Sequence, residues 1–163
     1  MDLVLARLPP PTDEELNTYL QKAIDICKSV GITSVHYAGV DDQTIRVLKS
    51  AIDANKFDIR VYAMLLGSKV NRTRWCNRME KDYKDKLTIR SVKLFMDGAL
   101  GSRGAALLQP YNDDPTNRGL LLMSESELHH EVSEWVSANL RLNQTTIINS
   151  SLLSDHRLNV VIK

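Results

Sequence analysis

Apolar residues in the first part of the chain recur at the spacing of an α-helix. Thr12 and Glu15 have the spacing of a capping box, in which each side chain accepts a hydrogen bond from the backbone N–H of the other residue. The pattern that follows predicts a helix over residues 12–30, and Gly31 supplies the left-handed backbone on which many helices end. The apolar positions of this helix are Leu16, Tyr19, Leu20, Ala23, Ile24, Cys27 and Val30.

Two further helices are predicted, each with one apolar face. Asp41 or Asp42 caps the first of them. The second begins with another capping box, formed by Ser124 and Glu127, and ends near Asn139. Their apolar positions are Ile45, Leu48 and Ile52 in the first helix and Leu128, Val132, Trp135 and Val136 in the second.

Apolar and β-branched runs between these helices predict strands over residues 32–38, 57–66 and 87–96. The run over 57–66 is apolar on both faces, as is usual for strands of parallel sheets. Residues 69–85 are mostly charged, with a few aromatic and apolar positions, and predict a surface helix. Helices that alternate with such strands predict an α/β fold whose parallel sheet is either doubly wound or barrel-like and is covered on both sides.

Two segments do not fit this alternation. Residues 97–119 are rich in glycine and polar residues and are longer than the ~2 to 6 residues usual between elements of an α/β unit, which favours a functional loop. Residues 140–163 are polar and rich in Asn, Ser and Thr, with short apolar clusters only.

Composition narrows the possible functions. The chain has 163 residues, 21 Lys and Arg against 20 Asp and Glu, and a net charge of +1, so no basic surface for nucleic acid is expected. No apolar run approaches the ~20 residues of a membrane span, and the start lacks the pattern of a signal peptide. Cys27 and Cys76 have neither zinc-site nor disulfide-scaffold spacing. We expect no nucleic-acid or membrane partner and, by default, a cytoplasmic location.

The richest chemistry lies where the predicted strand 87–96 enters the long loop. Ligands of parallel α/β folds bind at the carboxyl ends of strands, which is where Lys93 and Asp97 stand. A buried Lys is costly unless it is paired, exposed at the rim or neutralised, so it is either a rim residue or a functional one. Asp97 precedes Gly98 and either closes a turn through its own backbone or takes part in chemistry.

Two further side chains are candidates with competing explanations. Arg103 has the fork geometry to bind a substrate carboxylate, but it can also pair with Asp113 or Asp114 nearby. His36 lies near the end of a predicted strand, where it is either a metal ligand or proton-transfer group, or a hydrogen-bonded core residue. The glycine spacing G-x-x-G-x-x-G over 98–104 matches neither a dinucleotide fingerprint nor a Walker loop, which makes phosphate binding a weak hypothesis.

Several segments together resemble the amidohydrolase 3 family of metal-dependent hydrolases. They are residues 31–36 (GITSVH), 60–65 (RVYAML), 92–106 (VKLFMDGALGSRGAA), 110–115 (PYNDDP) and 117–121 (NRGLL). The resemblance covers residues 1–139 in the order and spacing of the family, and it marks residues 140–163 as a divergent tail.

The resemblance implies a (β/α) barrel of the TIM type with a divalent-metal site, usually zinc, at its carboxyl face. Such enzymes hydrolyse C–N bonds other than peptide bonds in small amide-like substrates with a metal-activated water. Lys93 takes the place of the strand lysine that CO₂ carboxylates into a ligand bridging two metals. Asp97 and His36 are implied as catalytic residues, and Arg103 is expected to contact substrate.

The sequence also departs from the family. An early H-x-H pair is missing, Tyr37 stands where the family has Asp in H-D-A-G, and residues 140–163 lack the family's V-A-V-H-A-I-G-D strand. A closed barrel has eight strands and typically ~250 residues, so we expect a partial barrel that is inactive as this fragment and binds no metal stably. The alternatives are a non-catalytic truncated product or interaction module, and a doubly wound domain whose glycine loop holds phosphate.

Overall fold

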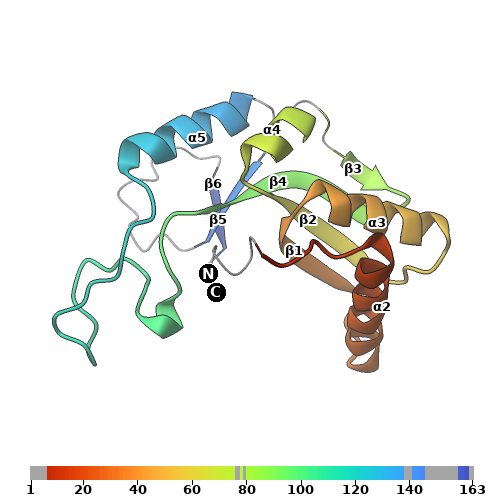
Figure 1. Ribbon diagram of the computed structural model, residues 1–163, viewed down its shortest axis with the longest axis horizontal. Helices are drawn as coiled ribbons and strands as arrows, with labels where there is room; N and C mark the ends of the chain where they lie inside the picture. The colour runs from red at the N-terminus through yellow and green to blue at the C-terminus, as the bar shows by residue number, and fades with distance from the viewer. Residues whose placement is uncertain (1–6, 76–77, 79, 138–140, 146–157, 162–163) are drawn as a thin grey trace.

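The computed structural model describes residues 7–75, 78, 80–137, 141–145 and 158–161. Helices and strands alternate over most of this length (Figure 1). The elements are α2 (Asp13–Ser29), β1 (Ser34–Val40), α3 (Asp42–Asp53), β2 (Arg60–Leu66), α4 (Lys69–Trp75), β3 (Glu80–Tyr83), β4 (Leu87–Phe95), the 3-10 turn η1 (Leu100–Ser102), α5 (Glu125–Ser137), β5 (Arg141–Thr145) and β6 (Leu158–Val161).

The helix starts follow the local sequence. Thr12 caps α2 through both bonds of the predicted capping box with Glu15, and Asp41 caps α3 by accepting the N–H of Thr44. Ser124 and Glu127 exchange the same pair of bonds ahead of α5. These contacts satisfy backbone N–H groups that a helix cannot satisfy within its own first turn.

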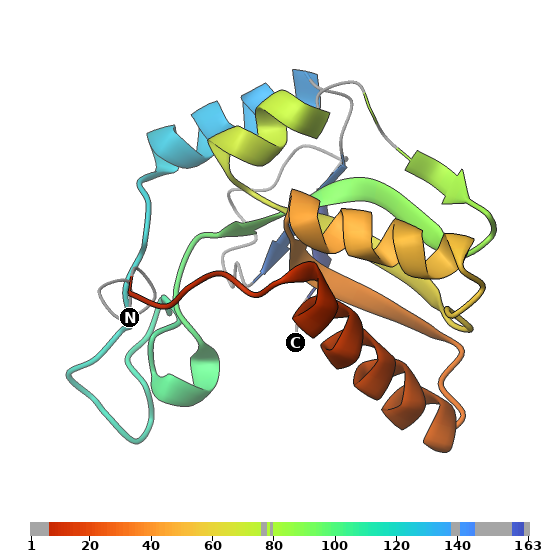
Figure 2. The ribbon, with the colours of Figure 1, turned by 45° about the vertical axis from the view of Figure 1, so that its right-hand side comes forward.

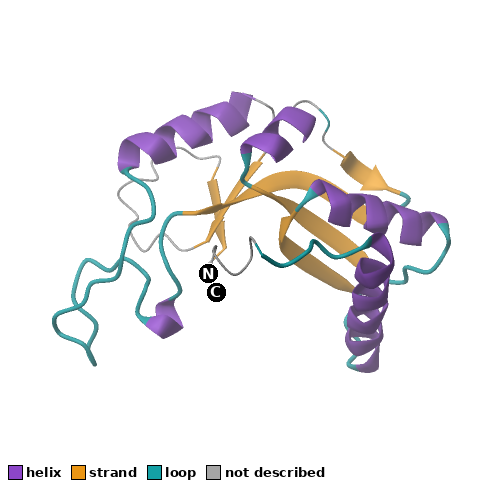
Figure 3. Cartoon of the chain, in the orientation of Figure 1, coloured by secondary structure: helices purple, strands orange, loops and turns teal. Residues whose placement is uncertain are grey.

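Five strands form a parallel path in the order β1-β2-β4-β5-β6, and β3 pairs antiparallel with β4 (Figure 3). β1, β2 and β4 are joined through α3 and α4, the connections expected between parallel neighbours. An α/β fold with a mainly parallel sheet is therefore confirmed. Two of the strands, β5 and β6, lie in the segment for which only short apolar clusters were predicted.

The prediction of one helix over 69–85 is wrong. The helix stops at Trp75, and residues 80–83 form β3, which is joined to β4 by a tight turn. Lys84 and Asp85 both have left-handed backbones, with φ of 53° and 57°, and the N–H of Lys86 donates to the carbonyl of Tyr83. Two left-handed central residues match the twist of an antiparallel pair, so the turn makes a hairpin out of charged residues that resembled a helix surface.

The core lies between the sheet and its helices on one face only (Figure 2). The helix-facing residues of β2 and β4 join apolar side chains of α2, α3 and α5 in one buried cluster. On the opposite face, which we call the open face, exposure varies: Phe95 is 49% exposed and His36 is exposed, whereas Met64, Ser91 and Lys93 are buried. The described helices therefore pack on one face of the sheet, and cover of both faces stays a prediction. Central members of the cluster are Ile24, Leu48, Ile52, Val61, Ala63, Leu65, Leu87, Ile89, Val92, Leu94, Leu128 and Trp135.

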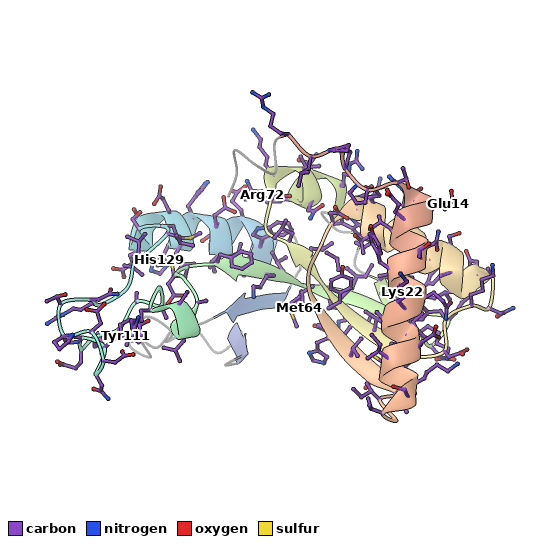
Figure 4. The ribbon with its side chains drawn as sticks, turned by 60° about the horizontal axis from the view of Figure 1, so that its bottom comes forward. Glu14, Lys22, Met64, Arg72, Tyr111 and His129 are labelled. Atoms are coloured by element: carbon purple, nitrogen blue, oxygen red, sulfur yellow. The ribbon has the colours of Figure 1, made fainter. Side chains whose placement is uncertain are left out.

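The long loop after β4 has a fixed conformation held by its own backbone. Its two halves are joined where the N–H of Leu107 donates to the carbonyl of Arg118 and the N–H of Leu122 donates to the carbonyl of Met96. The hydroxyl of buried Tyr111, marked in Figure 4, donates to the carbonyl of Ala105 at 2.8 Å. The loop is therefore a folded unit that extends from the carboxyl end of β4.

Gly119 is the residue on which this loop conformation depends most. Its φ is +78°, and a Cβ there would lie 1.9 Å from the carbonyl oxygen of Ala105. We expect Gly119→Ala to lower the free energy of unfolding by more than about 1 kcal/mol, because both the backbone angle and the contact are incompatible with a side chain. Urea unfolding followed by circular dichroism measures the change.

Gly101→Ala is the matched control for Gly119→Ala. Gly101 lies in the same loop, but a Cβ there would meet nothing within 4 Å. Its free energy of unfolding is expected to stay within about 0.5 kcal/mol of the parent chain. If the free energy of unfolding falls equally in Gly119→Ala and Gly101→Ala, the close approach of Gly119 to Ala105 does not fix the loop.

Candidate functional site

The candidate site lies on the open face of the sheet, at the carboxyl end of β4. Lys93 is the third residue from the end of this strand, and it is 7% exposed. Its neighbours Val92 and Leu94 belong to the helix-side core, so Lys93 points to the opposite face together with Phe95. The Nζ atom of Lys93 lies 4.7 Å from the centre of the Phe95 ring.

A β-bulge in β4 decides which face Lys93 occupies. Ile89 pairs with Ala63 of β2, whereas Ser91 pairs with Met64, so Arg90 is an extra residue in β4. Side chains of a regular strand alternate, and without the extra residue Lys93 would share the helix-side face with Ile89. The bulge moves Lys93 to the open face, and bulges are common next to active sites for this reason.

Two glycines lie next to Lys93. Gly39, with φ of +92°, stands at a register shift in β1, and a Cβ there would lie 3.9 Å from the Cγ of Lys93. Gly67 follows β2, and its N–H donates to the carbonyl of Lys93 at 2.9 Å. A Cβ on Gly67 would come within 2.3 Å of the Leu94 side chain. Neither glycine was predicted from the sequence. Gly39 is required by its positive φ, and Gly67 by its close approach to β4.

Asp97 lies beyond the end of β4 and is 7% exposed. Its Oδ2 accepts the N–H of Ala106 at 2.9 Å, and residue 97 also forms a β-bridge with Leu121. Oδ1 is buried without a hydrogen-bond partner among the described residues. Burial raises the pKa of the Asp97 carboxyl above its ordinary value, and the hydrogen bond from Ala106 opposes the rise. The contacts are those of a residue that closes the loop, while Oδ1 keeps a free acceptor.

Arg103 forms the local ion pair that the sequence offered as its alternative role. One of its terminal nitrogens lies 2.8 Å from Oδ2 of Asp113, and both side chains are largely exposed. The hydrogen bond and charge of Asp113 raise the pKa of Arg103, and the same hydrogen bond lowers the pKa of Asp113. Arg103 also has a left-handed backbone, with φ of 56°, where it ends η1. A role in substrate binding remains a prediction.

His36 is not brought close to Lys93. It is the third residue of β1, pairs with Tyr62 of β2, and is exposed on the open face. Tyr62 in turn pairs with Thr88, which lies five positions before Lys93 on β4. At ~3.3 Å per residue, His36 is on the order of 15 Å from Lys93 along the strands. The ring of His36 contacts Tyr62 instead, with centroids 5.1 Å apart.

Several amides of the glycine-rich segment are used in hydrogen bonds within the loop. The N–H of Gly98 donates to the carbonyl of Gly104, and the N–H of Gly104 donates to the carbonyl of Ala99. A Cβ on Gly98 would lie 2.8 Å from the Gly104 carbonyl, so these glycines allow two stretches of backbone to touch. Since these donors and the N–H of Ala106 are used internally, the geometry does not favour the phosphate-binding hypothesis.

A complete metal site does not follow from the described residues alone. Within residues 7–75, 80–137 and the other described positions, no group of three or more His, Cys, Asp and Glu side chains could hold one ion. Zinc takes three or four protein ligands. Lys93 could add one ligand after carboxylation, which leaves the set incomplete.

A parallel sheet with helices along one face, and polar groups at its carboxyl end, places the chain among α/β proteins whose ligand sites lie at that end. The sequence profile of the amidohydrolase family matches residues 1–151. The chain therefore belongs to the amidohydrolase family. The match includes part of the segment predicted as a divergent tail. None of the described helices has the length and apolar character to cross a membrane.

Individual relatives agree with this assignment. YtcJ of Bacillus subtilis, an amidohydrolase by name, is 28% identical over 132 residues, which are 78% of this chain and 24% of YtcJ. An uncharacterised metal-dependent hydrolase of Pyrococcus horikoshii has a TM-score of 0.73 and 30% identity, over 84% of this chain and 28% of that one. A similar hydrolase of Pyrococcus furiosus has a TM-score of 0.73 and 27% identity, over 84% and 29% of the two chains. The chain thus spans about a quarter of the length of these relatives.

Burial of Asp97 predicts an unusual pH dependence of stability. Its pKa in the folded chain is raised above 3.8, so its charge destabilises the fold at neutral pH, and this effect is relieved as pH falls through the raised pKa. The side-chain carbonyl of Asn in Asp97→Asn can still accept the Ala106 N–H. We expect the free energy of unfolding of this variant to exceed that of the parent chain by the largest amount near pH 7. The difference should shrink toward pH 4 in urea unfolding.

Asp113→Asn is the control, and its expected effect on stability at neutral pH is opposite to that of Asp97→Asn. The hydrogen bond from Arg103 lowers the pKa of Asp113, so its stabilising effect is present at neutral pH and is lost as pH falls through that lowered pKa. Asp113→Asn should therefore be less stable than the parent at pH 7. An Asp97→Asn difference that does not change with pH would show that Asp97 is not desolvated.

Proposed function

We propose that this chain is one arc of a (β/α) barrel in a metal-dependent hydrolase that cleaves C–N bonds other than peptide bonds in small amide-like substrates. Membership of the amidohydrolase family and the hydrolase relatives support the general chemistry. The one-sided core supports a barrel over a doubly wound sheet, because a barrel carries its helices on the outside and its site on the inner face.

The observation that carries the proposal is the position of Lys93. It is a buried lysine on the open face, at the carboxyl end of a central parallel strand. We propose that CO₂ carboxylates it and that the product is one ligand of a divalent metal, with zinc as the expected ion. When bound, the metal supplies a water of lowered pKa for attack on the substrate carbonyl.

The chemistry of Lys93 itself is simple. Its ammonium group first loses one proton to solvent. The neutral amine then attacks CO₂, so that an N–C bond forms, one C=O π bond of CO₂ breaks, and a second proton leaves to solvent. A cationic side chain thereby becomes an anionic carbamate with two oxygen donors. Phe95 at 4.7 Å and the neighbouring Leu66 limit access of water to this position.

The described part of the chain alone is not expected to supply all the ligands of a metal site. Since no group of three or more His, Cys, Asp and Glu side chains among the described residues could hold one ion, and zinc takes three or four protein ligands, we propose that further ligands come from outside the described set. We propose that the 163 residues do not complete the hydrolysis by themselves. Asp97 and Arg103 stay candidates for catalysis and substrate contact, whereas the distance from His36 to Lys93 argues against His36 as a ligand of the same ion.

Carboxylation of Lys93 is tested directly by ¹³C NMR of the purified chain with ¹³C-bicarbonate and Zn²⁺. We expect a carbamate resonance that is absent in Lys93→Met and retained in Lys86→Met, a variant at a half-buried lysine just before β4. Because one carbamate does not complete a zinc site, we expect only weak zinc binding by calorimetry, which bicarbonate strengthens in the parent and not in Lys93→Met. The absence of a carbamate in the parent chain would remove this role for Lys93.

Hydrolysis is tested with a panel of N-acyl amino acids and cyclic amides in the presence of Zn²⁺. We expect no turnover above that of zinc alone. Turnover that disappears in Lys93→Met would show that the chain completes a site by itself and would overturn the limit stated above. No carbamate and no bound zinc would instead favour the non-catalytic alternative, a product or interaction module without chemistry of its own.

A further inference from the structure

Asn71 is a buried polar residue that the proposed chemistry does not use. It is the third residue of α4 and is 3% exposed. A buried amide is costly unless it is hydrogen-bonded, so its partners reveal why it is there. Its own N–H donates to the hydroxyl of Ser68, which orients the residue at the start of the helix.

The side chain of Asn71 joins the ends of two strands. Its Nδ2 donates to the carbonyl of Leu66 at 2.8 Å and to the carbonyl of Val40 at 3.3 Å. Val40 and Leu66 are the last residues of β1 and β2. One –NH₂ group, which carries two donors, therefore holds neighbouring strands together where their own ladder stops.

Both strand ends lie against Lys93. Leu66 pairs with Lys93 in the sheet, and the next residue, Gly67, donates its N–H to the carbonyl of Lys93. On the other strand, Gly39 precedes Val40 and lies beside the Lys93 side chain. The two carbonyls that Asn71 holds are thus each one residue from a glycine that borders Lys93.

We propose that Asn71 is a positioning residue, which fixes the carboxyl ends of β1 and β2 around Lys93 without touching its amine. The inference rests on the proposed function of Lys93. Outer partners of ligand residues set the geometry of the ligand, and their loss typically costs ~10- to 100-fold in metal affinity or activity. Asn71 fits this role because the strand ends need a double donor, which neither Asp nor Leu supplies.

The test compares Asn71→Asp and Asn71→Leu with the parent chain, using Zn²⁺ affinity in bicarbonate and the amount of Lys93 carbamate as a function of pH. We expect both variants to bind Zn²⁺ at least about tenfold more weakly and to need a higher pH for the same carbamate. Thr73→Ala changes an exposed residue of the same helix and should behave like the parent. Ile52→Val supplies a core variant, with buffer conditions chosen so that its free energy of unfolding matches that of the Asn71 variants.

Hydrogen exchange of the Gly67 N–H separates failure of this inference from failure of the proposed function. We expect exchange of this N–H to be at least about tenfold faster in both Asn71 variants, and unchanged in Thr73→Ala. If the parent forms no carbamate but Gly67 exchange accelerates, the positioning role stands and the metal role of Lys93 fails. Normal Gly67 exchange in the Asn71 variants, or an equal loss of zinc affinity in stability-matched Ile52→Val, overturns the inference.

Discussion

Burial of one face of the sheet against the helices is the constraint on which the rest of this structure depends. Leu48 of α3, Ala63 of β2 and Ile89 of β4 lie in one buried cluster between helices and sheet. Each large apolar side chain in such a core contributes on the order of 1.5–3 kcal/mol. Because side chains of a strand alternate, burial of one face fixes which residues occupy the other, and that open face is the one that carries Lys93.

The sequence predicts the elements well where the pattern is local. The helix over 12–30 and the strands over 57–66 and 87–96 are confirmed to within a few residues, since capping boxes and apolar spacing are properties of neighbouring residues. The hairpin after Trp75 was missed because its signal, two left-handed residues at Lys84 and Asp85, is not visible in residue types that also suit a helix surface. Strand β5 was missed because its residues are mostly polar, and β6 because its apolar cluster is too short to predict a strand.

The sequence predicted where the candidate site lies but not which contacts its side chains make. Lys93 and Asp97 were found because the carboxyl end of a parallel strand is a known place for ligands. Their roles depend on contacts that spacing does not give: Asp97 accepts the N–H of Ala106, and Arg103 pairs with Asp113. His36 was expected near a strand end, but β1 continues to Val40, which leaves His36 toward the start of the strand.

Register links the core to the candidate chemistry. The extra residue Arg90 lets Leu87 and Ile89 face the helices while Lys93, an even number of positions later, faces away from them. A strand without this bulge would either bury the lysine among apolar side chains or expose Ile89 to water, and both are costly. The bulge therefore allows one strand to have both a continuous apolar face toward the helices and a polar carboxyl end. Since the bulge interrupts the regular pairing of β4 with β2, an additional hydrogen bond at the end of β2 is useful, and the bond from Asn71 to the carbonyl of Leu66 supplies it.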